Sequence, residues 1–238
     1  MASYKPLKWR PYVILSAAAS LDGKLATDAG DTNLSTKNDW KRVHLLRMES
    51  DAIMVGGGTI RKDDSKLVVD PKKSGSPISR QPIRVVVSAT GNIPLDARVI
   101  THDPIVPTLI AVTSNCSARQ VKKLEDVGCQ VIHCGNERSV DLSLLLSILK
   151  TKFMVNRLML EGGGRLNGSM LSLKLIDELQ IAYAPVIAGN GVSLFEFSQS
   201  FQDFSESPFF EIITSRRIDD MLWIHFKVHY TPRQLICL

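Results

Sequence analysis

Three consecutive glycines follow a strand-like segment in the run Glu161–Leu166, whose sequence is EGGGRL. The apolar segment Arg157–Leu160 precedes the run, and a helix-like segment, Asn167–Leu175, follows it. Glycine lets the backbone approach a phosphate closely, and the free N–H groups at the start of a helix attract negative charge. A strand-to-helix turn of this kind is therefore a candidate phosphate-binding site.

A second glycine-rich turn, Val55–Thr59 with the sequence VGGGT, lies well upstream in the chain. It follows the apolar strand-like segment Ala52–Val55 and precedes what we expect to be a short polar turn. A single Gly-Gly-Gly sequence is also an ordinary loop. Two such turns in equivalent contexts indicate a dinucleotide that is held at two points.

The composition is that of a soluble globular protein. The chain has 238 residues, 44% hydrophobic and 22% charged, which is long enough for one full core. The formal net charge of +5 favours a small anionic ligand, and no Lys/Arg stripe with interleaved aromatic residues predicts a nucleic-acid partner. No apolar stretch approaches the roughly 20 residues needed to cross a membrane. Residues 1–10 lack the apolar run of a signal peptide, so we predict a cytoplasmic protein without a membrane partner.

The cysteines and histidines do not follow a metal-binding pattern. Two histidines four residues apart, His225 and His229, fall in a segment that alternates like a strand, so we expect them to share one exposed face. The cysteines have neither Cys-x-x-Cys spacing nor the density of a disulfide framework, and we expect reduced, mostly structural thiols at Cys116, Cys129, Cys134 and Cys237. We predict no metal site.

Strand-like and helix-like segments alternate along the chain, which is typical of an α/β fold with a mostly parallel sheet and helices on both faces. The apolar run Pro11–Ala19 is expected to be a buried central strand. Two late segments predict a closing antiparallel hairpin, which makes the sheet mixed. The other expected strands are Ala52–Val55, Ile83–Val87, Thr108–Thr113, Gln130–His133, Arg157–Leu160 and Glu178–Val186, and the hairpin strands are Phe209–Thr214 and Met221–His229.

Capping residues mark the expected helices. Thr36 can cap a helix with Asp39 as a capping-box partner, and Ser117 begins a helix that reaches Asp126 and ends before Gly128. Further helices are expected at Ser139–Lys150 and Asn167–Leu175, and a surface loop at Asp70–Pro82. Because no repeat or low-complexity block interrupts this pattern, we expect a single domain.

Several further motifs accompany the two glycine turns. They are Ser20–Lys24 (SLDGK), Arg42–His44 (RVH), Lys62–Asp64 (KDD), Gln81–Val87 (QPIRVVV), Ile93–Val99 (IPLDARV), Ile176–Leu179 (IDEL) and Ala184–Gly189 (APVIAG). With these motifs in this order, the chain resembles the pyrimidine reductase family of riboflavin biosynthesis from about residue 11 to about residue 230. The resemblance implies a dihydrofolate-reductase-like fold, one reductase domain over residues 1–238, NADPH as cofactor and a homodimer.

The resemblance also implies a reaction. Members of the family reduce the ribosyl group of a pyrimidine ribosylamine 5′-phosphate to a ribityl chain, and two-domain members carry a zinc deaminase before the reductase. The chain has no His-x-Glu followed by Pro-Cys-x-x-Cys, which is the signature of such a deaminase. It therefore resembles the stand-alone reductases, whose substrate is 2,5-diamino-6-(ribosylamino)-4(3H)-pyrimidinone 5′-phosphate.

The cofactor-binding residues follow from the same resemblance. The family often has Asp-Ser on the adenosine side, after the strand Ile83–Val87, where this chain has Ser88 and Ala89. The lost carboxylate and the shifted hydroxyl change the contact with the 2′-phosphate, so NADH stays an alternative to NADPH. The resemblance places Thr59 and Asp63 on the cofactor, and Gly162, Gly163, Gly164 and Arg165 around its pyrophosphate, in agreement with the glycine-turn argument.

Lys24 and Glu161 are the candidate catalytic residues. Lys24 follows a tight turn after the expected central strand, where an ammonium can donate a proton or stabilise oxyanion charge. The alternative for Lys24 is a solvated turn lysine. Glu161 stands where strand ends meet ligands in open α/β sheets, and it can accept hydrogen bonds from pyrimidine N–H groups or ribityl hydroxyls. The alternative for Glu161 is a carboxylate paired with a nearby Arg or Lys.

Cations are needed for the 5′-phosphate of the substrate, and Arg42 and Lys66 are the candidates. The family commonly reads Asp-Asp-Pro-Arg-Leu-Thr where this chain has Asp63–Val68, DDSKLV. Lys66 keeps the charge of that arginine without its bidentate geometry, and Val68 loses a hydroxyl. Each candidate has the alternative of being a surface cation.

Three other functions are compatible with these motifs. The same reduction can act on the deaminated substrate, 5-amino-6-(5-phosphoribosylamino)uracil. The chain can be a general dihydrofolate-type reductase, against which the motifs Ser20–Lys24 and Glu161–Gly164 argue. It can also be a non-catalytic protein that binds NADP(H), an alternative that the departures at Lys66 and Val68 keep open.

Overall fold

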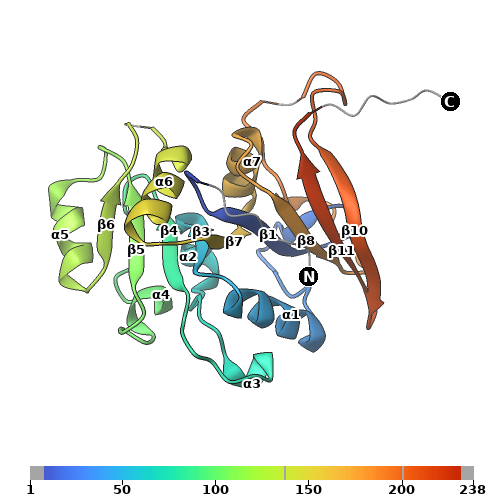
Figure 1. The fold of residues 1–238 in the computed structure, drawn as a ribbon, viewed down its shortest axis with the longest axis horizontal. Coiled ribbons are helices and arrows are strands. Elements are labelled where there is room, and N and C mark those ends of the chain that lie inside the picture. The colour runs from blue at the N-terminus through green and yellow to red at the C-terminus, as the bar shows by residue number, and fades with distance from the viewer. Residues whose placement is uncertain (1–7, 137, 200, 232–238) are drawn as a thin grey trace.

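A computed structural model describes residues 8–136, 138–199 and 201–231 of the protein. A nine-stranded sheet crosses the molecule in the order β10-β11-β8-β1-β7-β3-β4-β5-β6 (Figure 1). β2 and β9 form a separate two-stranded sheet. The strands are β1 (Tyr12–Ala19), β2 (Lys24–Thr27), β3 (Ala52–Gly56), β4 (Ile83–Val87), β5 (Thr108–Val112), β6 (Gln130–His133), β7 (Arg157–Gly162), β8 (Glu178–Tyr183), β9 (Gly191–Ser193), β10 (Phe209–Ile218) and β11 (Met221–His229).

The sheet is mostly parallel and mixed, as predicted. β1 pairs in parallel with β7 on one side and with β8 on the other, and the strands from β7 to β6 continue the parallel arrangement. β11 is antiparallel to both β8 and β10, so the predicted C-terminal hairpin is confirmed. The central position of β1 explains why its sequence is an almost unbroken apolar run.

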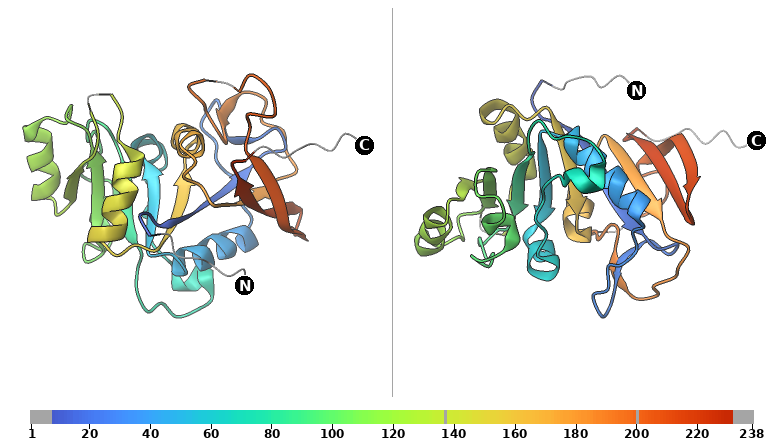
Figure 2. Two further views of the ribbon diagram at one scale, coloured as in Figure 1. Left: turned by 45° about the horizontal axis from the view of Figure 1, so that its top comes forward. Right: turned by 90° about the horizontal axis from the view of Figure 1, so that it is seen from below.

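Helices cover both faces of the sheet (Figure 2). Alternate residues of β1 enter the two layers, because Val13 and Leu15 join one hydrophobic core and Tyr12 and Ile14 join the other. The first core contains side chains of α6 and α7, and the second contains side chains of α1, α2, α4 and α5. The helices are α1 (Lys37–Met48), α2 (Gly57–Asp63), α3 (Pro71–Ser74), α4 (Arg98–Thr101), α5 (Ala118–Asp126), α6 (Leu142–Lys152) and α7 (Gly164–Ser172).

The capping residues define two helix starts as predicted. Thr36 accepts a hydrogen bond from the backbone N–H of Asp39, and Ser117 accepts one from Gln120. The chain reverses after α5 at Gly128, which has a φ of +88°. The carboxylate of Asp39 binds Arg42, so the prediction that it completes a capping box is wrong.

The boundaries of other elements differ from the predictions. α6 begins at Leu142 instead of Ser139, because the side chain of Asp141 caps it. α7 begins at Gly164, directly after the strand, and β8 ends at Tyr183. The polar turn expected after the first glycine run is the helix α2. The loop predicted at Asp70–Pro82 contains the short helix α3, which Asp70 caps.

Some side chains at the periphery correct smaller predictions. His225 is not on an exposed face, because its Nε2 lies 3.0 Å from the Glu178 carboxylate and its side chain is 23% exposed. Cys116, Cys129 and Cys134 are free and buried, and Cys237 lies outside the described residues. Among the described helices, none has the length and apolar character needed to span a bilayer.

Candidate active site

The fold brings the two glycine turns side by side. β3 and β7 are adjacent parallel strands, and α2 and α7 begin directly after them. The backbone N–H of Gly163 donates a hydrogen bond to the Thr59 hydroxyl over 3.1 Å, which joins the two turns. The Gly162–Gly163 peptide bond is cis. One ligand can therefore contact both turns, as the sequence predicts for a dinucleotide.

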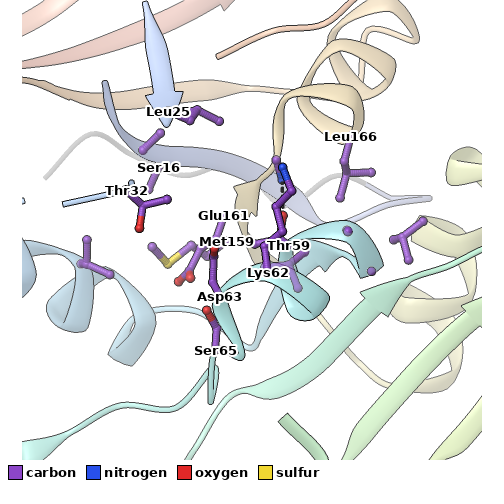
Figure 3. A pocket seen from close by; sticks show the side chains of 18 of the residues that line it. Ser16, Leu25, Thr32, Thr59, Lys62, Asp63, Ser65, Met159, Glu161 and Leu166 are labelled. Atoms are coloured by element: carbon purple, nitrogen blue, oxygen red, sulfur yellow. Dashed lines mark hydrogen bonds between the residues drawn. The ribbon is translucent and has the colours of Figure 1, made fainter. Parts of the chain in front are cut away.

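A cleft of about 1720 Å³ runs past both turns at the carboxyl ends of β1, β3, β4 and β7. Small-molecule sites usually occupy roughly 300–1,000 Å³, so this cleft has room for two ligands. Glu161, Asp63 and Thr59 lie at its centre, between Ser16 and Leu166 (Figure 3). The first turn of α7 opens into the cleft without an acidic residue or a side-chain cap, which leaves its N–H groups available to an anion.

Most of the predicted site residues line this cleft. They come from α2 and the loop after it, from the segment after β4, and from the end of β7 with the start of α7. The predicted residues that line the cleft are Thr59, Asp63, Lys66, Ala89, Glu161, Gly163, Gly164 and Arg165. The cleft thus gathers residues that are widely separated in the sequence.

Four predicted site residues, Lys24, Arg42, Ser88 and Gly162, are not in the cleft lining. The Lys24 ammonium donates a hydrogen bond to the Ser193 hydroxyl over 2.9 Å. The neighbouring residues Leu25 and Val192 do line the cleft, so Lys24 lies directly behind its wall. The guanidinium of Arg42 donates hydrogen bonds to the Asp39 carboxylate and to the Ser16 hydroxyl, and it lies over the Trp223 ring.

The other two residues have structural contacts. Ser88 packs against Gly57, where an added Cβ would lie 3.0 Å from the Ser88 side chain. Gly162 has a φ of +91° and faces the side chain of Asn167, so it shapes the turn behind the cleft surface. Neither contact places the residue against a ligand.

Glu161 forms a bidentate ion pair with Arg47 in the wall of the cleft. The two nitrogen–oxygen distances are 2.7 and 2.8 Å, and the side chains are only 14% and 9% exposed. The third nitrogen of Arg47 donates to the Val68 carbonyl over 2.8 Å. The expected alternative of a paired carboxylate is therefore observed, while Glu161 still lines the cleft. Partial desolvation raises the pKa of the Asp63 carboxyl, although the residue is exposed at the surface of the cleft.

No site role was predicted from the sequence for Arg47, His44 or Gln81, although the last two belong to the quoted motifs. Together these side chains hold residues 68–70 in the wall of the cleft. Arg47 binds the Val68 carbonyl, His44 Nδ1 accepts the Asp70 N–H over 3.0 Å, and the Gln81 amide exchanges two hydrogen bonds with Val69. The signal in the sequence was the spacing of His44 and Arg47, which places both on one face of α1.

His44 is expected to make the protein less stable in acid. Burial, followed by the charge of Arg47, lowers the pKa of His44 to about 4. As the pH is lowered from the pKa near 6.5 of an unfolded histidine to about 4, the unfolded chain binds a proton and the folded chain does not. The free energy of unfolding therefore decreases as the pH is lowered through this window. The linked loss is about 3 kcal/mol at most. His44→Asn keeps an acceptor for the Asp70 N–H and should flatten the pH dependence of Tm in this window; an unchanged slope relative to wild type would contradict the assignment.

The family of RibD C-terminal domains matches residues 11–220. The chain belongs to this family. It is 43% identical over 180 residues to the 2,5-diamino-6-ribosylamino-4(3H)-pyrimidinone 5′-phosphate reductase of Methanothermobacter thermautotrophicus, covering 76% of this chain and 80% of that protein. It is 40% identical over 186 residues to the enzyme of the same name from Archaeoglobus fulgidus, covering 76% and 83%.

Solved structures confirm the fold class. RibD of Acinetobacter baumannii matches with a TM-score of 0.78 at 24% identity, over 93% of this chain and 58% of that one. A pyrimidine reductase-like protein from Corynebacterium diphtheriae matches with a TM-score of 0.77 at 23% identity, over 92% of both chains. The family membership makes the chain an oxidoreductase and implies a nicotinamide cofactor.

The cleft fits such a cofactor. Gly58 lines the cleft, and the nearest atom to an added Cβ, 3.9 Å away, would be the end of the Arg61 side chain. Gly163 also lines it, and an added Cβ there would lie 3.1 Å from the Thr59 hydroxyl. The space over Gly58 is therefore not filled by protein, as the close approach of a ligand phosphate requires.

Proposed function

We propose that the protein catalyses the NADPH-dependent reduction of 2,5-diamino-6-(ribosylamino)-4(3H)-pyrimidinone 5′-phosphate to its ribitylamino product in riboflavin biosynthesis. The observation that carries the proposal is the match over most of the chain to stand-alone reductases of that name, up to 43% identical. The two glycine turns and residues of several other family motifs line one cleft, which supports it.

The nicotinamide cofactor, when bound, supplies the hydride that reduces the sugar carbon. Gly58, Gly163 and the first turn of α7 would hold its phosphates through backbone N–H groups and the helix dipole. Arg61, which lines the cleft near Ala89 and donates to the Asn92 carbonyl, favours the additional phosphate of NADPH over NADH.

Asp63 and Glu161 are the groups best placed to handle protons on the substrate. Asp63 is the candidate for proton donor, because it lines the cleft beside Glu161 without an ion-pair partner of its own among the described residues, whereas both Glu161 oxygens are bound by Arg47. Glu161 in turn can accept hydrogen bonds from the substrate's N–H or hydroxyl groups. Lys24 acts from behind the wall by positioning Ser193, whose carbonyl contacts the start of α7.

Lys24→Ala is expected to lower kcat about tenfold and to change the Kd of NADPH little, because it removes a support of the wall without removing a cofactor contact. Steady-state kinetics together with a fluorescence titration of NADPH would measure both quantities. A normal turnover rate would end the role of Lys24 in the reaction.

The function is tested by following the loss of NADPH absorbance with the diamino-pyrimidinone phosphate as substrate. The deaminated uracil phosphate, assayed in parallel, distinguishes the second candidate substrate. Binding of NADPH without oxidation by either compound would support the alternative of a non-catalytic NADP(H)-binding protein and overturn the proposal.

Three further features belong to the proposal. Residues 1–238 would act as a single reductase domain, in the cytoplasm. The protein would be a homodimer, for which the exposed edge strand β10 with Ile212 and Ile213 offers apolar surface. Sedimentation of the purified protein would test the oligomeric state.

A further inference from the structure

The cleft carries two separate groups of cationic side chains. One group lies on α2 and α7, the helices that follow the glycine turns, and comprises Arg61, Lys62 and Arg165, whereas Arg98 of α4 is paired with Asp64. The other group lies where the segment after α2 meets α1 and α3, and comprises Lys66, Lys72 and Lys73. We call the second group the lysine rim. A cofactor held at the glycine turns accounts for the first group only.

The other cations beside the lysine rim are occupied by protein partners. Arg47 uses all three guanidinium nitrogens on Glu161 and on the Val68 carbonyl. His44 accepts a hydrogen bond at Nδ1, so that nitrogen carries no proton. Arg42 is bound to Asp39 and Ser16. Among the described residues that line the cleft, the cations left for a ligand at this end are therefore the lysines.

The lysine rim is held in place by its surroundings. Asp70 caps α3 by accepting the backbone N–H of Lys72 at Oδ1 over 2.9 Å, which fixes the start of the short helix that carries Lys72 and Lys73. The Lys73 ammonium lies 4.9 Å from the centre of the Trp40 ring, and Trp40 also lines the cleft. This cation–π contact directs the charge of Lys73 toward the cleft.

The contacts along the wall fix the order of the two groups. Glu161 lies next to the glycine turn and binds Arg47, and Arg47 in turn binds the Val68 carbonyl. Asp70, which follows Val68 in the chain and binds His44, leads into α3 and the lysine rim. A ligand at the lysine rim thus lies on the far side of Glu161 from the cofactor phosphates. We propose that Lys66, Lys72 and Lys73 bind the 5′-phosphate of the substrate, an inference that rests on the proposed function and names residues for the phosphate in place of Arg42.

The test is a double variant, Lys72→Met with Lys73→Met, which keeps the apolar stems and removes both charges. We expect the KM for the phosphorylated substrate to rise about tenfold, with kcat and the KM for NADPH nearly unchanged, because charged contacts to a phosphate are lost. Calorimetry with ribose 5-phosphate as the probe should show a Kd that is about tenfold weaker than for wild type. Lys41→Met is the matched control, since Lys41 lies next to α3 at Gly75 and outside the cleft lining.

The outcomes separate this inference from the proposed function. If wild type does not oxidise NADPH with the pyrimidine substrate, the proposed function fails, and the ribose 5-phosphate titration still decides whether the lysine rim binds a phosphate monoester. If wild type turns over normally and the double variant keeps the wild-type KM and Kd, the lysine rim is not the phosphate site. A rise in the KM for NADPH alone would assign these lysines to the cofactor and also overturn the inference.

Discussion

Glu161→Gln is expected to lower kcat about 100- to 10,000-fold, which is the range for loss of a group that exchanges or orients protons in the reaction. Glutamine has nearly the same shape as glutamate, but it places an amide nitrogen against one of the two Arg47 nitrogens. The positive charge of Arg47 is then left uncompensated inside the cleft wall. The free energy of unfolding should fall by about 1–3 kcal/mol as a consequence.

The matched control is Glu196→Gln. Glu196 also lines the cleft, but its partner Arg165 is 93% exposed and 3.4 Å away, so the pair contributes little. We expect a kcat and a Tm close to wild type for this control. Glu161→Gln with a wild-type kcat and a lowered Tm would reduce Glu161 to a structural partner of Arg47.

Gly58→Ala is expected to weaken NADPH binding without weakening the fold. Apart from its chain neighbours and the backbone of α2 itself, only the end of Arg61 among the described residues comes within 4 Å of the added methyl group, and alanine in a helix is more favourable than glycine by roughly 0.5–1 kcal/mol. A ligand phosphate that approaches the Gly58 backbone would meet the methyl group, at a cost of about 1–3 kcal/mol, or roughly 5- to 150-fold in Kd. Fluorescence titration of NADPH and a thermal melt would measure the two effects.

Gly163→Val should also weaken NADPH binding, but its added Cβ lies 3.1 Å from the Thr59 hydroxyl, so it disturbs protein and ligand together. Gly58→Ala is the cleaner substitution for this reason. A stable Gly58→Ala protein with wild-type affinity for NADPH would exclude a cofactor phosphate from this turn.

The strands were predictable because their sequence is dominated by burial. A parallel strand covered on both faces is an apolar run, and β1, β3, β4, β5 and β7 all have that form. β2 and β9 escaped prediction because they pair with each other outside the main sheet and are only partly buried. The start of α6 was misplaced because two polar residues, Ser139 and Asp141, offered caps and local spacing does not choose between them.

The parts of the site that depend on backbone geometry were predictable. The parts that depend on hydrogen bonds and ion pairs between side chains of different segments were much less so. The glycine turns, Thr59 and Glu161 lie in the cleft because each stands at a strand end, which the chain pattern reveals. Arg42 and Lys24 each bind a hydroxyl from a distant segment, and no local pattern shows that Arg42 binds Ser16 or that Lys24 binds Ser193. The same is true of the bidentate contact between Arg47 and Glu161.

Residues 68–70 have no neighbouring strand and depend on Arg47, His44 and Gln81 for their hydrogen bonds. Two of these side chains come from α1 and the third from the segment before β4, yet all support one end of the cleft. Damage to any of them should therefore impair recognition of the sugar phosphate selectively and spare the dinucleotide. The two ligand affinities of this enzyme can accordingly change independently during evolution or engineering.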